Sequence, residues 1–119
     1  MTTLHTTNSY SFLKHIPVVT LVLVNLFGMT VHASPQLNDA DDRISDQAIK
    51  ADYATFSTMQ ARIAAHNSKG IAVSDYRLAK AQCWLDVSLH EYTHNDRSNF
   101  SQQALNEADK ILAALSEGT

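Results

Sequence analysis

The stretch from His90 to His94, HEYTH, has the H-E-x-x-H spacing used by helical zinc peptidases. Residues four apart lie on one face of an α-helix, so His90 and His94 could bind the same ion. Glu91 would then act as a general base toward a metal-bound water. Asp86, four residues before His90, could add an oxygen ligand on that face. A small zinc hydrolase is therefore one hypothesis for this chain.

The surrounding sequence argues against catalysis. A catalytic zinc ion usually has three protein ligands, and Arg97 stands where the longer H-E-x-x-H-x-x-G-x-x-H motif has Gly. Glu107 or Glu117 could be the third ligand only if a later helix folded back suitably. His94 falls at a predicted helix end, a poor place for a preorganised ligand. We predict no enzyme, no cofactor, and no catalytic, cofactor-binding or metal residues. Adventitious zinc or copper affinity of the two histidines stays an alternative.

The N-terminal residues have the layout of a secretory signal peptide. Residues 16–31 are mostly apolar and uncharged, and the preceding fifteen residues contain Lys14 as their only Lys or Arg. Val31 and Ala33 suit the positions read by signal peptidase. We predict a signal peptide over 1–33, removed after Ala33. The alternative is an uncleaved segment, which would make the protein a membrane-tethered helical accessory.

The predicted mature chain, residues 34–119, is acidic. Removal of Lys14 leaves 8 Lys and Arg against 12 Asp and Glu. This balance gives no support for a nucleic-acid partner, which would require a basic patch. Cys83 is the only cysteine, so no disulfide can form within the chain. It is expected to be a buried small side chain, or else to pair between two molecules.

Apolar residues recur at three- and four-residue steps after a flexible lead-in over 34–39. The spacing predicts helices over about 40–66, 75–93 and 102–116, with Gly70 in a left-handed position after the first. Three apolar stripes should form the core: Ile49, Tyr53, Phe56, Met59 or Gln60, and Ile63; Leu78, Ala81, Leu85, Leu89 and Tyr92; Ala104, Ala108, Ile111, Leu112 and Leu115.

No segment alternates with the period of a β-strand. The fold class is therefore predicted to be all-α, a small up-down helical bundle over 40–119, made of a long helical hairpin plus a third helix. Ser74 and Ser101 are the expected N-caps of the second and third helices. Trp84 is expected to pack between helices, with an exposed anchor for a partner as the alternative. Cys83, Trp84 and Val87 flank the second stripe, so that helix could be contacted on more than one side.

The block YRLAKAQCWLDVSLHEYTHNDRSNF, Tyr76 to Phe100, resembles a helical region that precedes the peptidoglycan-binding domain in some OmpA-family envelope proteins of Gram-negative bacteria. The family block has Arg at the position of His94, which makes HEYTH a substituted helix end. The chain lacks the β/α sequence of the peptidoglycan-binding domain, so the resemblance transfers no wall-binding residue. It implies a periplasmic or outer-membrane-associated, non-enzymatic module. A partner would be another envelope protein or the missing OmpA-like domain. Self-association is left open.

Overall fold

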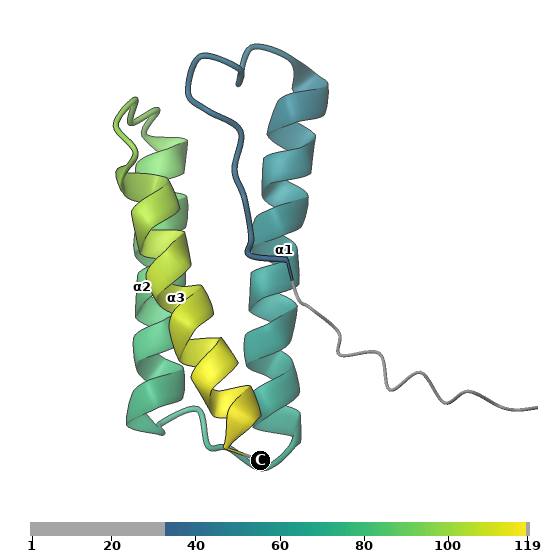
Figure 1. Ribbon diagram of the computed structural model, residues 1–119, viewed down its shortest axis with the longest axis vertical. Helices are drawn as coiled ribbons and strands as arrows, with labels where there is room; N and C mark the ends of the chain where they lie inside the picture. The colour runs from purple at the N-terminus through teal and green to yellow at the C-terminus, as the bar shows by residue number, and fades with distance from the viewer. Residues whose placement is uncertain (1–32, 119) are drawn as a thin grey trace, which may run out of the picture. The chain divides into compact units, whose positions relative to one another are not determined.

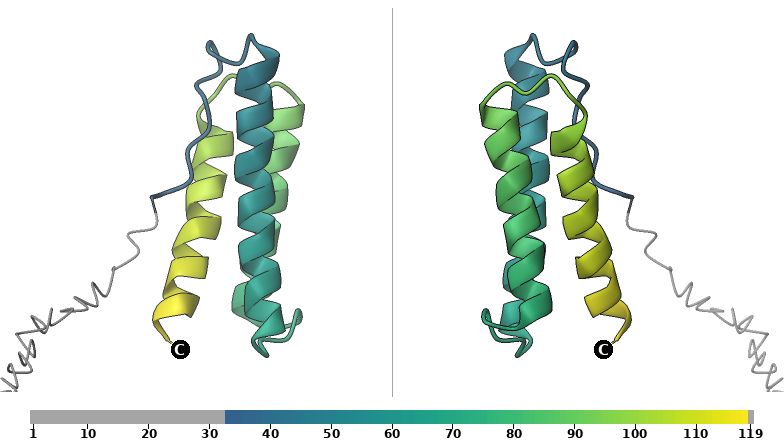
Figure 2. Two further views of the ribbon diagram at one scale, coloured as in Figure 1. Left: turned by 90° about the vertical axis from the view of Figure 1, so that its right-hand side faces the viewer. Right: turned by 90° about the vertical axis from the view of Figure 1, so that its left-hand side faces the viewer.

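Three antiparallel helices form the part of the protein that the computed structural model describes, residues 33–118. They are α1 (Asp46–Ser68), α2 (Tyr76–Thr93) and α3 (Phe100–Glu117). Figure 1 and the side views in Figure 2 show successive helices running in opposite directions. The predicted all-α up-down bundle is confirmed. The signal peptide prediction falls almost entirely on residues outside the described range.

The core lies where the three helices face one another. Contact between α2 and α3 is the most extensive, and α1 packs less closely on this pair. Fully buried Leu78 and Ala81 of α2 belong to the same core cluster as Leu105 and Leu112 of α3. The predicted stripes of α2 and α3 are confirmed, except that Leu89 and Ile111 are only partly buried. The other buried apolar side chains of the core are Leu37, Phe56, Met59, Ile63, Leu85, Tyr92, Ala104, Ala108 and Leu115.

Two small polar side chains join α2 to α3. The Ser88 hydroxyl donates to the Ser101 carbonyl at 2.7 Å, and the Ser101 hydroxyl donates to the Ser88 carbonyl at 2.8 Å. Both residues are fully buried. Because the serines bond each other's backbone, each buried hydroxyl is satisfied without a larger side chain. Ser101 is therefore an inter-helix contact, and its prediction as the N-cap of α3 is wrong, since Asn99 takes that position.

The first helix begins six residues later than the sequence predicted. The Ser45 hydroxyl accepts from the backbone N–H of Ala48 at 3.1 Å and caps α1, while residues 40–44 form turns. Asp75, not Ser74, caps α2 through its carboxylate. At the end of α1, Gly70 has φ of 103°, so its prediction as a left-handed residue is confirmed.

The buried face of α1 differs from the predicted stripe. Tyr53 is 45% exposed and Ile49 is 36% exposed. The face turned to the core instead carries Asp52, Phe56, Met59, Ile63 and His66. Its spacing is still helical, but it includes an acid and a histidine that a hydrophobic pattern assigns to solvent. The stripe prediction is thus wrong at its N-terminal end and right from Phe56 onward.

The segment before α1 packs against the helices, although its composition predicted only a flexible lead-in. Leu37 is buried in the core, and its N–H donates to the Gln102 side chain at 2.8 Å. The Gln102 amide donates back to the Pro35 carbonyl at 3.0 Å. Figure 1 shows this segment running beside α1 on the side of α3. Residues 35–38 therefore connect α1 and α3.

Among residues 33–118, none of the three helices combines the length and the hydropathy required to cross a bilayer.

Candidate functional site

HEYTH lies at the end of α2, where His90 to Thr93 form the last turn and His94 is the C-cap. His90 and His94 are both exposed, with ring centroids 4.1 Å apart. The His94 Nδ1 lies 2.9 Å from the His90 carbonyl oxygen. In the described part of the chain, no group of three or more His, Cys, Asp or Glu side chains could hold a metal ion. The two histidines thus share a face as predicted, but no other side chain of residues 33–118 supplies the third ligand of a catalytic zinc site.

The inward-facing residue of HEYTH is Tyr92, one of the unspecified positions of the motif. Its ring is buried and makes an edge contact with Phe56, with centroids 5.3 Å apart. Its hydroxyl donates to the Asp52 carboxylate at 2.8 Å, across 40 residues of sequence. The end of α2 is thereby fixed to α1 through a side chain that the zinc motif ignores.

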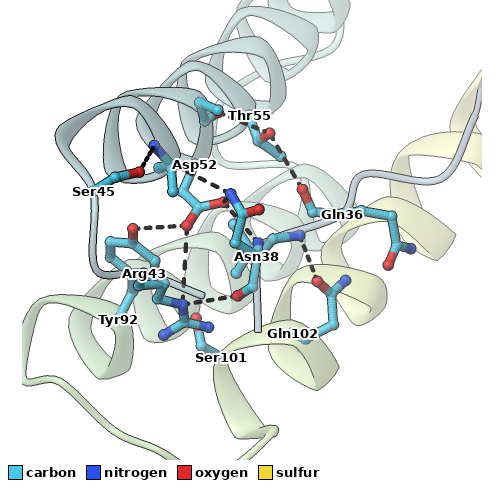
Figure 3. A network of polar contacts seen from close by, with 12 residues as sticks. Gln36, Asn38, Arg43, Ser45, Asp52, Thr55, Tyr92, Ser101 and Gln102 are labelled. Carbon is cyan, nitrogen blue, oxygen red and sulfur yellow. Dashed lines mark hydrogen bonds and ion pairs between the residues drawn. The ribbon is translucent and has the colours of Figure 1, made fainter. Parts of the chain in front are cut away.

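Asp52 is the centre of a buried polar network, drawn in Figure 3. It is 1% exposed. One carboxylate oxygen accepts from the backbone N–H of Asn38 at 2.8 Å and from its side-chain amide at 3.0 Å. The other accepts from Tyr92. Both oxygens are therefore occupied by protein donors, as a buried carboxylate requires.

Arg43 also belongs to this network and contacts Asn38, Asp52 and Tyr92. Its Nε donates to the Asn38 carbonyl at 2.8 Å and lies 3.9 Å from the Asp52 carboxylate. Its guanidinium sits 4.5 Å from the centroid of the Tyr92 ring, in a cation–π arrangement. Burial and then the hydrogen bond to Asp52 raise the pKa of Tyr92. The hydroxyl thus remains a donor to Asp52, and the arrangement serves to join segments of the chain.

The other acids considered as ligands are engaged elsewhere or exposed. The Asp86 carboxylate accepts from Gln82 at 2.8 Å. The Glu107 carboxylate pairs with Lys110 at 2.6 Å on the surface of α3, and Glu117 is exposed near the other end of that helix. Asp86, Glu107 and Glu117 therefore do not complete the histidine pair.

Cys83 is exposed on α2, so the prediction that it is a buried small side chain is wrong. Its position follows from the register of α2. Leu78, Ala81 and Leu85 turn toward the core, which leaves Cys83 on the opposite face.

An apolar groove lies between α2 and α3, with no contribution from α1. Its volume is about 480 Å³, and it is lined by Trp84, Phe100, Gln103, Ala104, Asn106, Glu107 and Lys110. Trp84 is half-buried against the core, and Phe100 is 42% exposed. Trp84 therefore packs between the helices, as expected, and also presents part of its ring to solvent.

A second pocket, about 470 Å³, lies between the lead-in segment and the start of α3. Arg43 and Arg97 line it together with Asp39 and Asp41. Arg97 forms an ion pair with Asp41 across the pocket wall. Since the two arginines face nearby acids, the pocket offers no net cationic surface for an anion.

Comparison with protein-family models, with curated proteins and with solved structures gave no significant match to this chain.

Proposed function

We propose that this protein is an exported, non-enzymatic helical module of the bacterial cell envelope, located in the periplasm, that acts by binding another envelope protein. The observation that carries this proposal is the apolar groove formed by α2 and α3. A half-buried tryptophan beside an exposed phenylalanine is the kind of surface that supplies most of the binding energy in protein interfaces.

The shape of the groove favours an amphipathic helix as its ligand. Trp84 and Phe100 provide apolar contact area, while Glu107 and Lys110 place both charge signs at the border. A channel between two packed helices accepts the apolar face of a third helix, and a mixed-charge border sets its orientation. The two helices that form the groove are joined to each other by the hydrogen bonds between Ser88 and Ser101.

The sequence supports this assignment independently. Both aromatic residues of the groove fall within the block, Tyr76 to Phe100, that resembles OmpA-family envelope proteins. The predicted signal peptide would deliver the module to the compartment where those proteins occur. The zinc hydrolase alternative gains no support, because His90 and His94 lack a third protein ligand among the described residues.

Site-specific photo-crosslinking in Gram-negative cells tests the proposal. A photoreactive residue at Gln103, exposed in the groove, should capture an envelope protein when the full-length chain is expressed. The same residue at Ser57, exposed on α1, is the matched control and should capture nothing above background. Trp84→Ser should abolish the Gln103 product, because it removes much of the apolar area of the groove.

The crosslinks are read on periplasmic chain whose N-terminus is Ser34, as cleavage after Ala33 requires. Equal capture at Gln103 and Ser57 would contradict the proposal, as would a Gln103 product that survives Trp84→Ser. A product consisting of two copies of this chain would replace the partner protein with self-association. A recovered chain that retains residues 16–31 would favour the membrane-tethered alternative.

A further inference from the structure

We propose that His90 and His94 form one half of a zinc site and that a single zinc ion links two copies of this chain. The side chains lie one helical turn apart on α2, both exposed, with ring centroids at 4.1 Å. Imidazole nitrogens suit zinc, and two histidines at this spacing can bind one ion from the same side. This goes beyond the sequence-based expectation, which assigned no metal residue.

The hydrogen bonding of His94 prepares it as a ligand. Its Nδ1 is 2.9 Å from the His90 carbonyl oxygen, which can only accept, so Nδ1 carries the proton. The other ring nitrogen of the neutral imidazole, Nε2, is then unprotonated and has a lone pair that can bind a metal ion. Metal-binding histidines in proteins usually donate the other ring N–H to a carboxylate, a backbone carbonyl or a water, which fixes the tautomer and the ring orientation.

The last turn of α2 is held firmly enough to present the pair. Tyr92 lies between the two histidines in sequence and is fixed in the core by its 2.8 Å bond to Asp52. Asn95 follows in a left-handed conformation, with φ of 56°, and its N–H bonds the Tyr92 carbonyl at 3.1 Å. The histidines therefore belong to an anchored helix end, which limits the fraying expected of such a position.

The ligand count points to a second chain. Structural zinc sites are tetrahedral with four protein ligands, and in the described part of one chain no third His, Cys, Asp or Glu joins His90 and His94. A two-fold related copy supplies the same two residues and completes four nitrogens, in the symmetry that most homodimers have. Cys83 and Val87 lie on the same face, seven and three residues before His90. They would provide adjoining contact area of low polarity.

Sedimentation of the mature protein tests the inference. The chain is purified from the periplasm and stripped of metal, and zinc chloride is then titrated. The mass should double at about one zinc ion per two chains and return to the starting value with a chelator. His94→Arg should prevent the doubling while the fold survives, because a cation near a helix C-terminus is favourable. Asp86→Asn is the matched control and should leave the doubling intact.

Several outcomes would overturn the inference: a mass that does not change with zinc, one zinc ion per chain without a change in mass, or doubling that persists in His94→Arg. This test is independent of the test of the proposed function, because the zinc site uses His90 and His94 whereas the groove uses Trp84 and Phe100. Trp84→Ser should leave the zinc-dependent doubling intact, and His94→Arg should leave the Gln103 crosslink intact.

Discussion

Asp52→Ala should destabilise the protein by about 3–5 kcal/mol, the cost of removing one partner from a buried ion pair. Its carboxylate accepts from Tyr92 and twice from Asn38, and it faces the Arg43 guanidinium. Without it, the Tyr92 hydroxyl and the Asn38 backbone N–H lose their acceptor, and the Arg43 guanidinium loses its counter-ion. Urea unfolding followed by far-UV circular dichroism measures the change. A domain this small has little reserve of stability, so the variant is expected to be largely unfolded at room temperature.

Two further variants make this result interpretable. Asp52→Asn keeps an acceptor oxygen and the side-chain volume, so it should remain folded and fall between wild type and Asp52→Ala. Asp46→Ala removes an exposed acid from the first turn of the same helix and should cost at most about 1 kcal/mol. If Asp52→Ala were as stable as Asp46→Ala, the network would not contribute to the fold in the way described.

Phe56→Ala should destabilise the protein by about 3–5 kcal/mol, because it removes a ring from the centre of the core. Phe56 is buried, and its ring contacts the Tyr92 ring at 5.3 Å. Ile49→Ala is the matched control on the same helix and should cost much less, since Ile49 is partly exposed. Chemical unfolding of both variants distinguishes the observed face of α1 from the predicted stripe. Equal losses would mean that α1 also buries its Ile49 side.

The sequence predicted α2 and α3 well because their buried faces are almost purely apolar. Leu78, Ala81, Leu85 and Tyr92 follow helical spacing on α2, and the buried residues of α3 do the same, with one small serine on each face. In such a helix the hydrophobic period alone identifies the face that meets its neighbours. The third observed helix begins two residues before the predicted start, and the second begins one residue after it, differences that arise at the caps.

The face of α1 was harder to predict, because a carboxylate occupies a core position. Asp52 is buried only because Asn38, Arg43 and Tyr92 surround it, and Tyr92 is 40 residues away in sequence. The spacing of apolar residues cannot predict that a polar residue is buried when its hydrogen-bond partners come from other segments of the chain. For the same reason the sequence did not predict the burial of Leu37 or the packing of the lead-in segment, which depends on hydrogen bonds to Gln102 of α3.

The H-E-x-x-H motif in HEYTH does not include the residue of this stretch that matters most for the fold. The pattern directs attention to His90, Glu91 and His94, whereas the residue that anchors the helix is Tyr92. The clue available in the sequence was the predicted stripe of α2, since Tyr92 continues the spacing of Leu78, Ala81 and Leu85. That spacing already placed Tyr92 toward the core and its two histidine neighbours toward solvent. The partner of its hydroxyl could not be identified before the fold was known.

The most direct test of the central claim, that HEYTH is an anchored helix end and not a catalytic centre, is a peptidase assay of the mature protein and of Glu91→Gln with zinc present. A zinc peptidase requires the glutamate as general base, and the substitution preserves the size of the side chain. The expected result is that wild type and Glu91→Gln are indistinguishable and neither cleaves a mixed peptide library above background. Zinc-dependent cleavage by wild type that disappears in Glu91→Gln would contradict the account.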